Sequence, residues 1–331
     1  MHTIAAGCAF KLIEIAAAAG AKPDALGAIE LPPRGADGFE TRIPFERQLD
    51  LWEAILRSLR DPGFPIFVAS GLRLSDYSVI GFAAMTRATL REAFHQTIRY
   101  QRVWTNAADW ALDEQGGTAT LRFVTDEPRR LGMRCNSECA VAEIVNAGRI
   151  LTGTTDAPRE IRFRHSAPTD VSAHEAFFRA PLRFDAPDNA IVIDAKLLDT
   201  PLLKADPELA RFFQRHGDAL LANRAKDESI TQRLEAVLVQ TLRHGAPTIE
   251  DAARRIGMST RTLRRRLQEE GSRFQDVLER SRCDLAKRYL AEPKLAVGEV
   301  AFLLGFSEPS AFHRAFKRWT GKTPLEHRRR P

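Results

Sequence analysis

The feature that most constrains the fold is a pattern that occurs twice in the last third of the chain. Each copy is a glycine followed within a few residues by a basic, helix-like segment. The first copy runs from Gly257 to Leu267 (GMSTRTLRRRL), and the second runs from Gly305 to Trp319 (GFSEPSAFHRAFKRW). Large apolar residues recur four positions apart in both, as on the buried face of a helix. The pattern predicts two glycine turns, each leading into a helix with a basic outer side.

Capping residues and apolar spacing predict the helices around these turns. Ser229, Thr248 and Ser259 are suitable N-caps, and Asp251 lies in the acidic position of a capping box after Thr248. Glycine at the two turns permits the left-handed backbone that ends a helix. Helices are expected over 229–242, 248–256, 260–269, 274–291, 297–304 and 307–319. From residue 229 onward the sequence therefore predicts an all-α domain with two helix-turn-helix motifs joined by a long helix.

The basic charge of the chain is concentrated in the same region. Residues 228–331 carry 21 Lys and Arg against 13 Asp and Glu, whereas the preceding residues carry 28 against 30. A basic domain suits a nucleic-acid partner, because neutralising phosphates releases counterions. A solvated charged face would give the same balance, so charge alone leaves both interpretations open.

Residues 248–329 resemble the DNA-binding domain of AraC/XylS-type transcription regulators. The resemblance is carried by Gly257, Ser259, Leu263, Arg265, Gly271, Arg282, Ala286, Val300, Ala301, Gly305, Phe306, Phe312, Arg314, Phe316, Lys317, Gly321, Lys322, Thr323, Pro324 and Arg328. It implies a regulator whose two recognition helices enter successive major-groove segments of one duplex. Helices in adjacent turns of DNA lie about 34 Å apart, and the helix over 274–291 is the expected spacer.

The resemblance also implies which residues contact DNA. The base-reading positions of the first motif are Arg261, Arg264 and Arg265, with Thr260 beside them. The base-reading positions of the second motif are Pro309, Ser310, His313 and Arg314. Arginine to guanine is the commonest specific contact, whereas proline lacks a backbone donor and serine is short. We therefore expect the first helix to read more bases than the second. Lys317 and Arg318 are expected to hold phosphates or to face solvent, and Phe316 and Trp319 to pack in the core.

The first two thirds of the chain alternate between helical and strand patterns. Helices are expected over 45–59, 88–104, 129–151 and 208–224, and strands over 110–113, 119–124, 160–165 and 190–194. The sequence Gln115-Gly116-Gly117 between two of the strands indicates a hairpin. The pattern favours an α+β regulatory domain over residues 1–205, a connecting helix and linker over 206–228, and the DNA-binding domain over 229–331. The helix over 208–224 could connect the domains or form a dimer contact, and the sequence leaves both open. The expected boundary is Lys226-Asp227-Glu228.

Two N-terminal segments, 81–94 and 177–202, are similar to the regulatory domain of an AraC-type subgroup. This subgroup includes ornithine- and arginine-responsive activators and mycobacterial virulence regulators. The resemblance implies a small-molecule effector and a dimer interface, but no effector identity, and the family's reference to arabinose does not indicate a sugar. An N-terminal domain that only oligomerises is the alternative. An apolar pocket with a few inward polar groups would favour sensing, and a solid core would favour assembly.

Catalytic and metal-binding motifs are missing from the sequence. Cys135 and Cys139 lie one helical turn apart and could form a metal or redox pair, but no second pair accompanies them, so a buried helix face is favoured. His165 and His174 are interpreted as isolated histidines, which are more often structural than pH-sensing. There is no phosphate-binding glycine loop and no Gly-x-Ser-x-Gly motif. We expect neither enzymatic activity nor a cofactor.

The remaining expectations concern location and partners. No apolar run reaches the roughly 18 residues of a membrane helix, and Lys11 and Glu14 interrupt the apolar N-terminal segment, which does not have the pattern of a signal peptide. Four cysteines in 331 residues do not form a disulfide framework. The expected protein is a cytoplasmic, nucleoid-associated activator. Its expected partners are promoter DNA, RNA polymerase, a small-molecule effector and a second copy of the chain.

Overall fold

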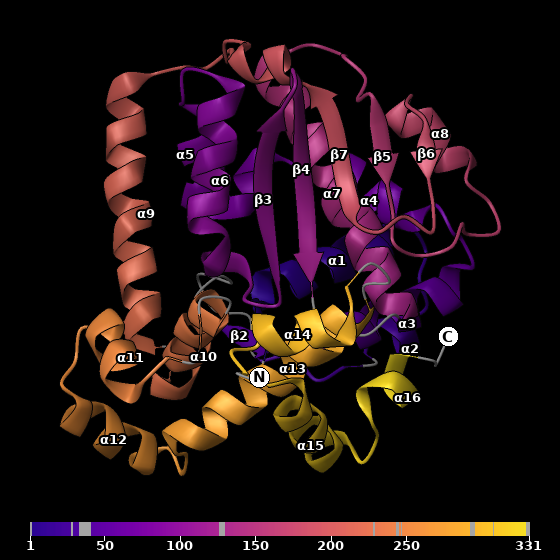
Figure 1. Cartoon of the computed structure of the whole chain (residues 1–331). Coiled ribbons are helices and arrows are strands. Elements are labelled where there is room, and N and C mark those ends of the chain that lie inside the picture. Colours follow the sequence, from indigo (N-terminus) through magenta and orange to yellow (C-terminus); the bar gives the residue numbers. More distant parts are fainter. Residues whose placement is uncertain are drawn as a thin grey trace. The chain divides into compact units, whose positions relative to one another are not determined.

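The computed structural model describes residues 2–27, 29–32, 41–125, 130–227, 229–242, 245, 247–291, 295–306 and 308–328 (Figure 1). It forms two compact units, residues 1–222 (unit 1) and residues 223–331 (unit 2). Four residues used in the sequence predictions, Arg129, Glu228, Ser307 and Arg329, lie outside the described residues.

Unit 1 combines helices with a short strand pair and a larger sheet. Its elements are β1 (Thr3–Ala5), α1 (Ala6–Ala18), α2 (Pro23–Leu26), β2 (Arg42–Pro44), α3 (Phe45–Leu59), α4 (Phe64–Gly71), the 3₁₀ helix η1 (Leu74–Tyr77), α5 (Ser78–Met85), α6 (Leu90–Trp104), β3 (Ala108–Gln115), β4 (Thr118–Thr125), α7 (Leu131–Thr152), β5 (Glu160–Arg162), α8 (Ser172–Phe178), β6 (Leu182–Arg183), β7 (Asn189–Asp194), the 3₁₀ helix η2 (Ala195–Asp199) and α9 (Pro207–Asp227). The predicted mixed α and β architecture is confirmed.

The larger sheet has five strands in the order β3-β4-β7-β5-β6 (Figure 1). Neighbouring strands are antiparallel except for the parallel pair β5 and β6. The predicted hairpin is confirmed, with Gln115 opposite Thr118 at its turn. The strand predicted over 160–165 ends at Arg162, because the backbone N–H of Arg164 donates to the Asn189 side chain (2.9 Å) and not to a neighbouring strand.

The core of unit 1 lies between the sheet and the helices. On β4, the alternate residues Ala119, Leu121 and Phe123 are buried, whereas Val124, which follows Phe123, is exposed. Successive side chains of this strand therefore point alternately to the core and to the outer face. Helices α6 and α7 both contact sheet strands. The helix predicted over 45–59 is confirmed, with Leu49, Trp52 and Ile55 buried along one face. Helix α6 starts at Leu90 and not at Ala88, because Thr89 is its N-cap and accepts the N–H of Glu92.

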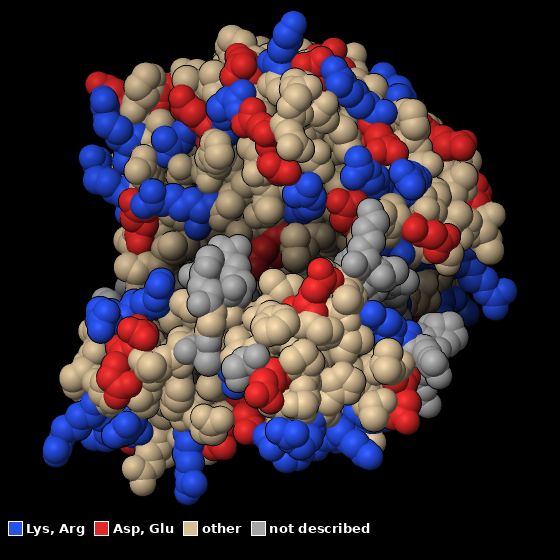
Figure 2. All heavy atoms as spheres, viewed as in Figure 1, with Lys and Arg blue, Asp and Glu red and all other residues tan. Residues whose placement is uncertain are grey.

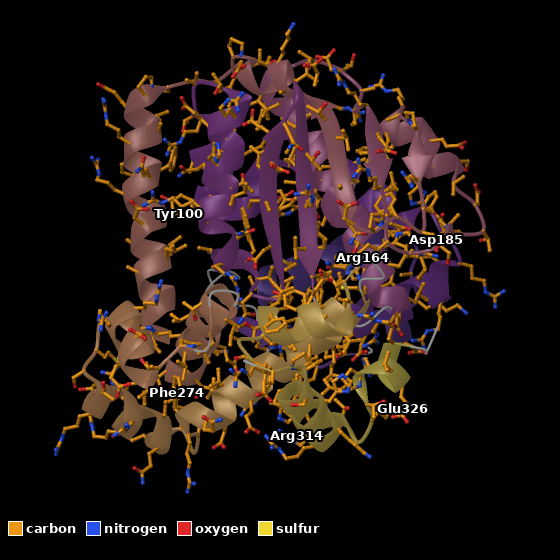
Figure 3. The ribbon with its side chains drawn as sticks, viewed as in Figure 1. Tyr100, Arg164, Asp185, Phe274, Arg314 and Glu326 are labelled. Carbon is orange, nitrogen blue, oxygen red and sulfur yellow. The ribbon has the colours of Figure 1, made fainter. Side chains whose placement is uncertain are left out.

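Helix α9 packs against α6 around the buried ring of Tyr100, which lies between the two helices (Figure 3). The Tyr100 hydroxyl donates to Asp218 (2.7 Å) and contacts the carbonyl of Gln214 (3.1 Å). A Cβ atom on Gly217 would lie only 2.9 Å from Cζ of this ring, so glycine is required for the close approach. These contacts place most of α9 in unit 1.

Unit 2 is entirely helical in its described residues, as predicted. Its helices are α10 (Ile230–Thr241), α11 (Ile249–Ile256), α12 (Thr260–Glu269), α13 (Phe274–Ala291), α14 (Val297–Leu303), α15 (Pro309–Thr320) and α16 (Pro324–Arg328). Three predicted N-caps are confirmed: Ser229, Thr248 and Ser259 accept the backbone N–H groups of Gln232, Asp251 and Thr262. One buried cluster, which includes Leu234, Leu263, Leu285, Phe312 and Phe316, forms the core.

Candidate nucleic-acid interface and ligand cavity

Unit 2 contains two copies of one three-helix arrangement, α10-α11-α12 and α13-α14-α15. The turn after the second helix of each copy closes in the same way. Gly257 and Gly305 adopt positive φ angles of 76° and 71°. In the first copy the N–H of Met258 donates to the carbonyl of Ala253 (2.9 Å), and in the second Phe306 donates to Ala301 (3.0 Å). The two turns therefore orient the helices that follow by the same backbone hydrogen bonds.

An arginine from the first helix of each copy binds the end of the second. Arg233 donates to the carbonyl of Ile256 at 2.9 Å. Arg282 donates to the carbonyls of Leu304 (3.0 Å) and Gly305 (3.1 Å). Its guanidinium carbon also lies 4.5 Å from the centre of the Phe306 ring. A cation at a helix C-terminus satisfies carbonyls that have no partner within the helix.

The outer helices α12 and α15 match position by position at a spacing of 49 residues. Leu263 and Leu267 of α12 correspond to Phe312 and Phe316 of α15, and all four side chains are buried. The two glycines are only 48 positions apart, so the second turn is one residue longer than the first. This buried pair in each copy fixes which side of the helix faces outward.

The residues expected at DNA form matched pairs under the same spacing. The pairs are Thr260 with Pro309, Arg261 with Ser310, Arg264 with His313, and Arg265 with Arg314. The three arginines of α12 and Arg314 are exposed, as are Pro309 and Ser310, while Thr260 and His313 are half-buried. The exposed members of each set thus face solvent while Thr260 and His313 are partly covered, and Arg314 projects outward from α15 (Figure 3).

The α12 surface is the more basic of the two. Arg261, Arg264, Arg265 and Arg266 are all exposed there, and Lys and Arg gather along the edge of unit 2 that carries α12 and α15 (Figure 2). Arg265 forms an ion pair with Glu269 (2.8 Å), in which the side chains are 65% and 56% exposed. A pair this exposed contributes only about 0–1 kcal/mol, so Arg265 can leave Glu269 at little cost.

Lys317 and Arg318 differ in their surroundings. Both are exposed, but Arg318 lies 2.8 Å from Glu279 of α13, and the indole N–H of the half-buried Trp319 donates to the same carboxylate (3.2 Å). Arg318 therefore helps to attach α15 to α13. Phe316 is buried, as predicted.

Unit 1 contains a cavity of about 210 Å³ that sequence reasoning did not locate. Most of its wall is apolar. Its polar and ionisable lining residues are Cys8, Lys11, Gln48, Asp76, Tyr77, Thr97, Gln101, Thr105, Asn136, Cys139 and Glu143. A concave, mostly apolar site with a few polar groups is the usual form of a small-molecule site.

Three side-chain atoms in this wall are buried without a hydrogen-bond partner. They are the amide oxygen of Gln48 and the indole nitrogens of Trp52 and Trp104. Gln48 and Trp52 are only 4% and 2% exposed. An unpaired buried polar atom costs about 1–3 kcal/mol.

Glu143 is the acidic centre of the cavity. The Cys139 thiol donates to its carboxylate (3.1 Å), as does the Tyr77 hydroxyl. Burial raises the pKa of Glu143, and burial raises the pKa of the Cys139 thiol well above its usual value. Glu143 follows Cys139 by one helical turn of α7, and this spacing is the sequence signal that could have indicated it.

The paired cysteines lie on a buried face of α7. Burial raises the pKa of the Cys135 thiol to about 12, so both thiols are held in the protonated form, which neither ligates metals well nor attacks as a nucleophile. Among the described residues, no three His, Cys, Asp or Glu side chains gather as a metal site.

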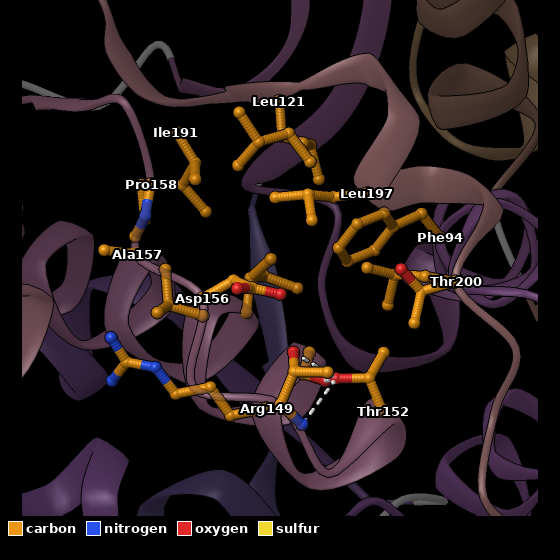
Figure 4. A pocket seen from close by; sticks show the side chains of 16 residues that line it. Phe94, Leu121, Arg149, Thr152, Asp156, Ala157, Pro158, Ile191, Leu197 and Thr200 are labelled. Atoms are coloured by element: carbon orange, nitrogen blue, oxygen red, sulfur yellow. Dashed lines mark hydrogen bonds between the residues drawn. The ribbon is translucent and has the colours of Figure 1, made fainter.

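A separate pocket of about 60 Å³ lies beside Phe94, Leu121 and Leu197 (Figure 4). It is too small for a ligand of more than a few atoms.

The interpretation of His165 and His174 as isolated histidines is wrong. Both lie 3.4 Å from the fully buried carboxylate of Glu138, one on each oxygen. Burial lowers the pKa of His165. Phe163 and Phe184 contact both imidazole rings. The cluster joins α7, α8 and the chain after β5, which are too distant in sequence for spacing to reveal the contact.

Comparison with known proteins agrees with this geometry. Residues 252–330 match a helix-turn-helix domain model. Residues 20–202, more than half of the chain, match the model described as the N-terminal arabinose-binding domain of AraC transcription regulator. Two basic helix-turn-helix motifs behind a mixed α and β domain are those of a DNA-binding transcription regulator.

The chain belongs to the AraC family of transcription regulators. The ornithine utilization regulator of Pseudomonas aeruginosa is 28% identical over 97% of this chain and 94% of its own length. VirS of Mycobacterium tuberculosis is 29% identical over 90% of this chain and 88% of its own. The crystal structure of the regulator CdpR from Pseudomonas aeruginosa has 25% identity and a TM-score of 0.48, covering 97% of this chain and 98% of that one. None of the described helices has the length and apolar character of a membrane span.

Proposed function

We propose that the protein is an effector-responsive activator of transcription that reads DNA with α12 and α15 and senses a small molecule in the cavity of unit 1. The observation that carries the sensing role is the cavity itself, with its unpaired polar atoms at Gln48, Trp52 and Trp104. A domain that served only for assembly would gain stability from a filled core.

The base-reading set that we propose consists of Thr260, Arg261, Arg264 and Arg265 on α12 and of Pro309, Ser310, His313 and Arg314 on α15. The exposure of six of these residues, all except the half-buried Thr260 and His313, supports this role. Lys317 would hold a phosphate, whereas Arg318 would do so only after leaving Glu279.

Further parts of the proposal follow from this role. An activator acts at promoters through RNA polymerase, in the cytoplasm and on the nucleoid, without a catalytic step of its own. We propose a homodimer that forms through unit 1 or α9, where Phe212 (53% exposed) and Leu209 (46% exposed) leave apolar surface uncovered.

The DNA-reading role can be tested by in vitro selection. Full-length protein would be incubated with random duplexes, and the enriched sequence compared between the wild type and the variants Arg264→Ala and His313→Ala. Each variant should lose its preference at one set of base pairs only, because each side chain reaches a limited stretch of the groove. Unchanged base preferences in both variants would contradict the assignment.

The sensing role can be tested by filling the cavity. Ala140→Phe would place a ring in the space lined by α7, and Ala157→Phe, at the separate small pocket, is the matched control. Transcription from a selected site should become independent of added metabolites in the first variant and remain responsive in the second. A wild type whose transcription no metabolite extract alters would favour the alternative, in which unit 1 only oligomerises.

A further inference from the structure

Aromatic rings are concentrated around the cavity of unit 1. Three of the four tryptophans of the chain line it, and Phe45, Tyr77 and Phe123 do so as well. The tryptophans are Trp52, Trp104 and Trp110. The rings of Tyr77 and Trp104 meet edge to face with their centres 5.7 Å apart. Faces of tryptophan and tyrosine rings attract cations through their quadrupole.

The two acidic residues of this wall, Asp76 and Glu143, differ in their partners. Glu143 receives hydrogen bonds from the Cys139 thiol and the Tyr77 hydroxyl, and no Lys, Arg or His in the described part of unit 1 bonds to it. Lys11, the basic residue of the lining, is 3.5 Å from Asp76 and 3.6 Å from Glu14. Glu143 is therefore the acidic group of the lining whose ionised form would gain most from a cationic ligand.

The size of the cavity limits the ligand. An apolar cavity of about 150 Å³ binds benzene, so a volume of about 210 Å³ suits one ring with a short substituent.

We propose that the cavity binds a small organic cation, consisting of one apolar ring and an ammonium group placed against Glu143 and the aromatic faces. This assignment rests on the proposed sensing function of unit 1 and names the chemical class of its effector. The ammonium group of the ligand would be the basic partner that Glu143 lacks. A cation would therefore be preferred over neutral and anionic molecules of the same shape.

Three compounds with the same hydroxyphenyl ring test the assignment: tyramine (a cation), tyrosol (neutral) and 4-hydroxyphenylacetate (an anion). Binding to the full-length protein would be measured by calorimetry and by tryptophan fluorescence. Tyramine should bind at least about tenfold more tightly than tyrosol, and the anion should bind most weakly. Glu143→Gln should remove most of the preference for tyramine, whereas Glu14→Gln, which changes an exposed carboxylate at 57% exposure, should preserve it.

A pH series adds a readout that a structural role of Glu143 would not change. Since burial raises the pKa of Glu143, its carboxylate becomes available to a cation only as the pH rises. Affinity for tyramine should therefore increase with pH and then level off, while affinity for tyrosol stays flat. The other titratable groups that line this cavity are Cys8, Lys11, Asp76, Tyr77 and Cys139. The two thiols stay protonated over this range because burial raises the pKa of Cys8 to about 12 and that of Cys139 well above its usual value.

Each result decides between the assignment and the sensing function. Equal binding of the three compounds, a preference for the anion, or no binding of any of them would overturn the cation assignment. If tyramine binds as expected but leaves DNA binding and transcription unchanged, the site stands and the proposed sensing function fails. If another metabolite alters transcription while tyramine does not bind, the sensing function stands and the cation assignment fails.

Discussion

At the scale of single residues, Arg265 has one interaction in the structure, with Glu269, and one that we propose, with a base of DNA. In the free protein it pairs with Glu269 on the exposed surface. A bidentate contact to guanine contributes about 1–3 kcal/mol, more than an exposed ion pair. We predict that Arg265→Ala weakens binding to a selected site by about tenfold to a hundredfold, while binding to random DNA changes little.

Fluorescence anisotropy at one fixed salt concentration would measure both affinities, because salt alters each of them. Arg280→Ala is the matched control, since Arg280 is also an exposed arginine paired with a glutamate, Glu235, but lies on α13. Equal losses on selected and random DNA would show that Arg265 only holds a phosphate.

The pH dependence of stability is a second prediction at this scale. The pKa of His165 is lowered in the folded protein by burial, whereas in the unfolded chain it is about 6.5. Below that pH the unfolded state binds the proton more readily, so the free energy of unfolding should fall as the pH drops through 6.5 toward the folded pKa. His165→Gln should flatten this dependence, and His95→Gln, at an exposed position, should not. Urea unfolding at several pH values would measure the free energy of unfolding as a function of pH. The same pH dependence for the wild type and His165→Gln would contradict the prediction.

Which residues could be predicted from sequence depended on how far apart their partners lie along the chain. Ser259 caps a helix three residues away, and Leu263 and Leu267 share a helix face, so local patterns were sufficient. Glu143 meets Tyr77 from another element, and Glu138 meets two histidines beyond β5. Contacts of that kind arise only when the core assembles, and single-sequence periodicity does not encode them.

At the scale of elements, the two arginines that bind helix ends should control the positions of the outer helices. Arg282 makes two charged hydrogen bonds to carbonyls and Arg233 makes one. Hydrogen bonds to charged groups contribute about 1.5–3 kcal/mol each. We predict that Arg282→Ala destabilises unit 2 by about 2–4 kcal/mol, and that Arg233→Ala has a smaller effect.

Hydrogen exchange of the amides in α14 and α15 would show where Arg282→Ala lowers the stability of unit 2. Thermal unfolding would measure by how much the stability falls. Arg280→Ala on the same helix is again the control, because its partner is a side chain and not a helix end. A change of less than about 0.5 kcal/mol for Arg282→Ala, the range of ordinary surface substitutions, would contradict this role.

Element boundaries followed from the sequence where a cap or a glycine marks them. Helices α12 and α13 begin and end at the predicted residues, whereas β5 is shorter than predicted because a side chain, Asn189, takes over its hydrogen bonding. The packing of α9 against Tyr100 depends on Gly217. An isolated glycine within a helical pattern does not reveal such a contact.

At the scale of the whole molecule, the division into units predicts that the second can act without the first. Unit 2 has its own buried cluster, which includes Leu238 and Phe316. We predict that deleting residues 1–225 leaves a folded, monomeric fragment that binds a half-site specifically. Light scattering would give its mass and anisotropy its affinity. A fragment that binds no sequence specifically at any salt concentration would contradict the division.

The unequal copies within unit 2 have a consequence for the promoters that such a protein could serve. One chain presents a threonine and three arginines on α12 but a proline, a serine, a histidine and an arginine at the matching positions of α15. Two different readers in one polypeptide have no two-fold axis between them, unlike the paired motifs that select palindromes. If both helices read bases as we propose, a site bound by one chain has a direction. Reversing it would present each reader with the other's bases, so the orientation of the site relative to the transcription start becomes part of the regulatory signal.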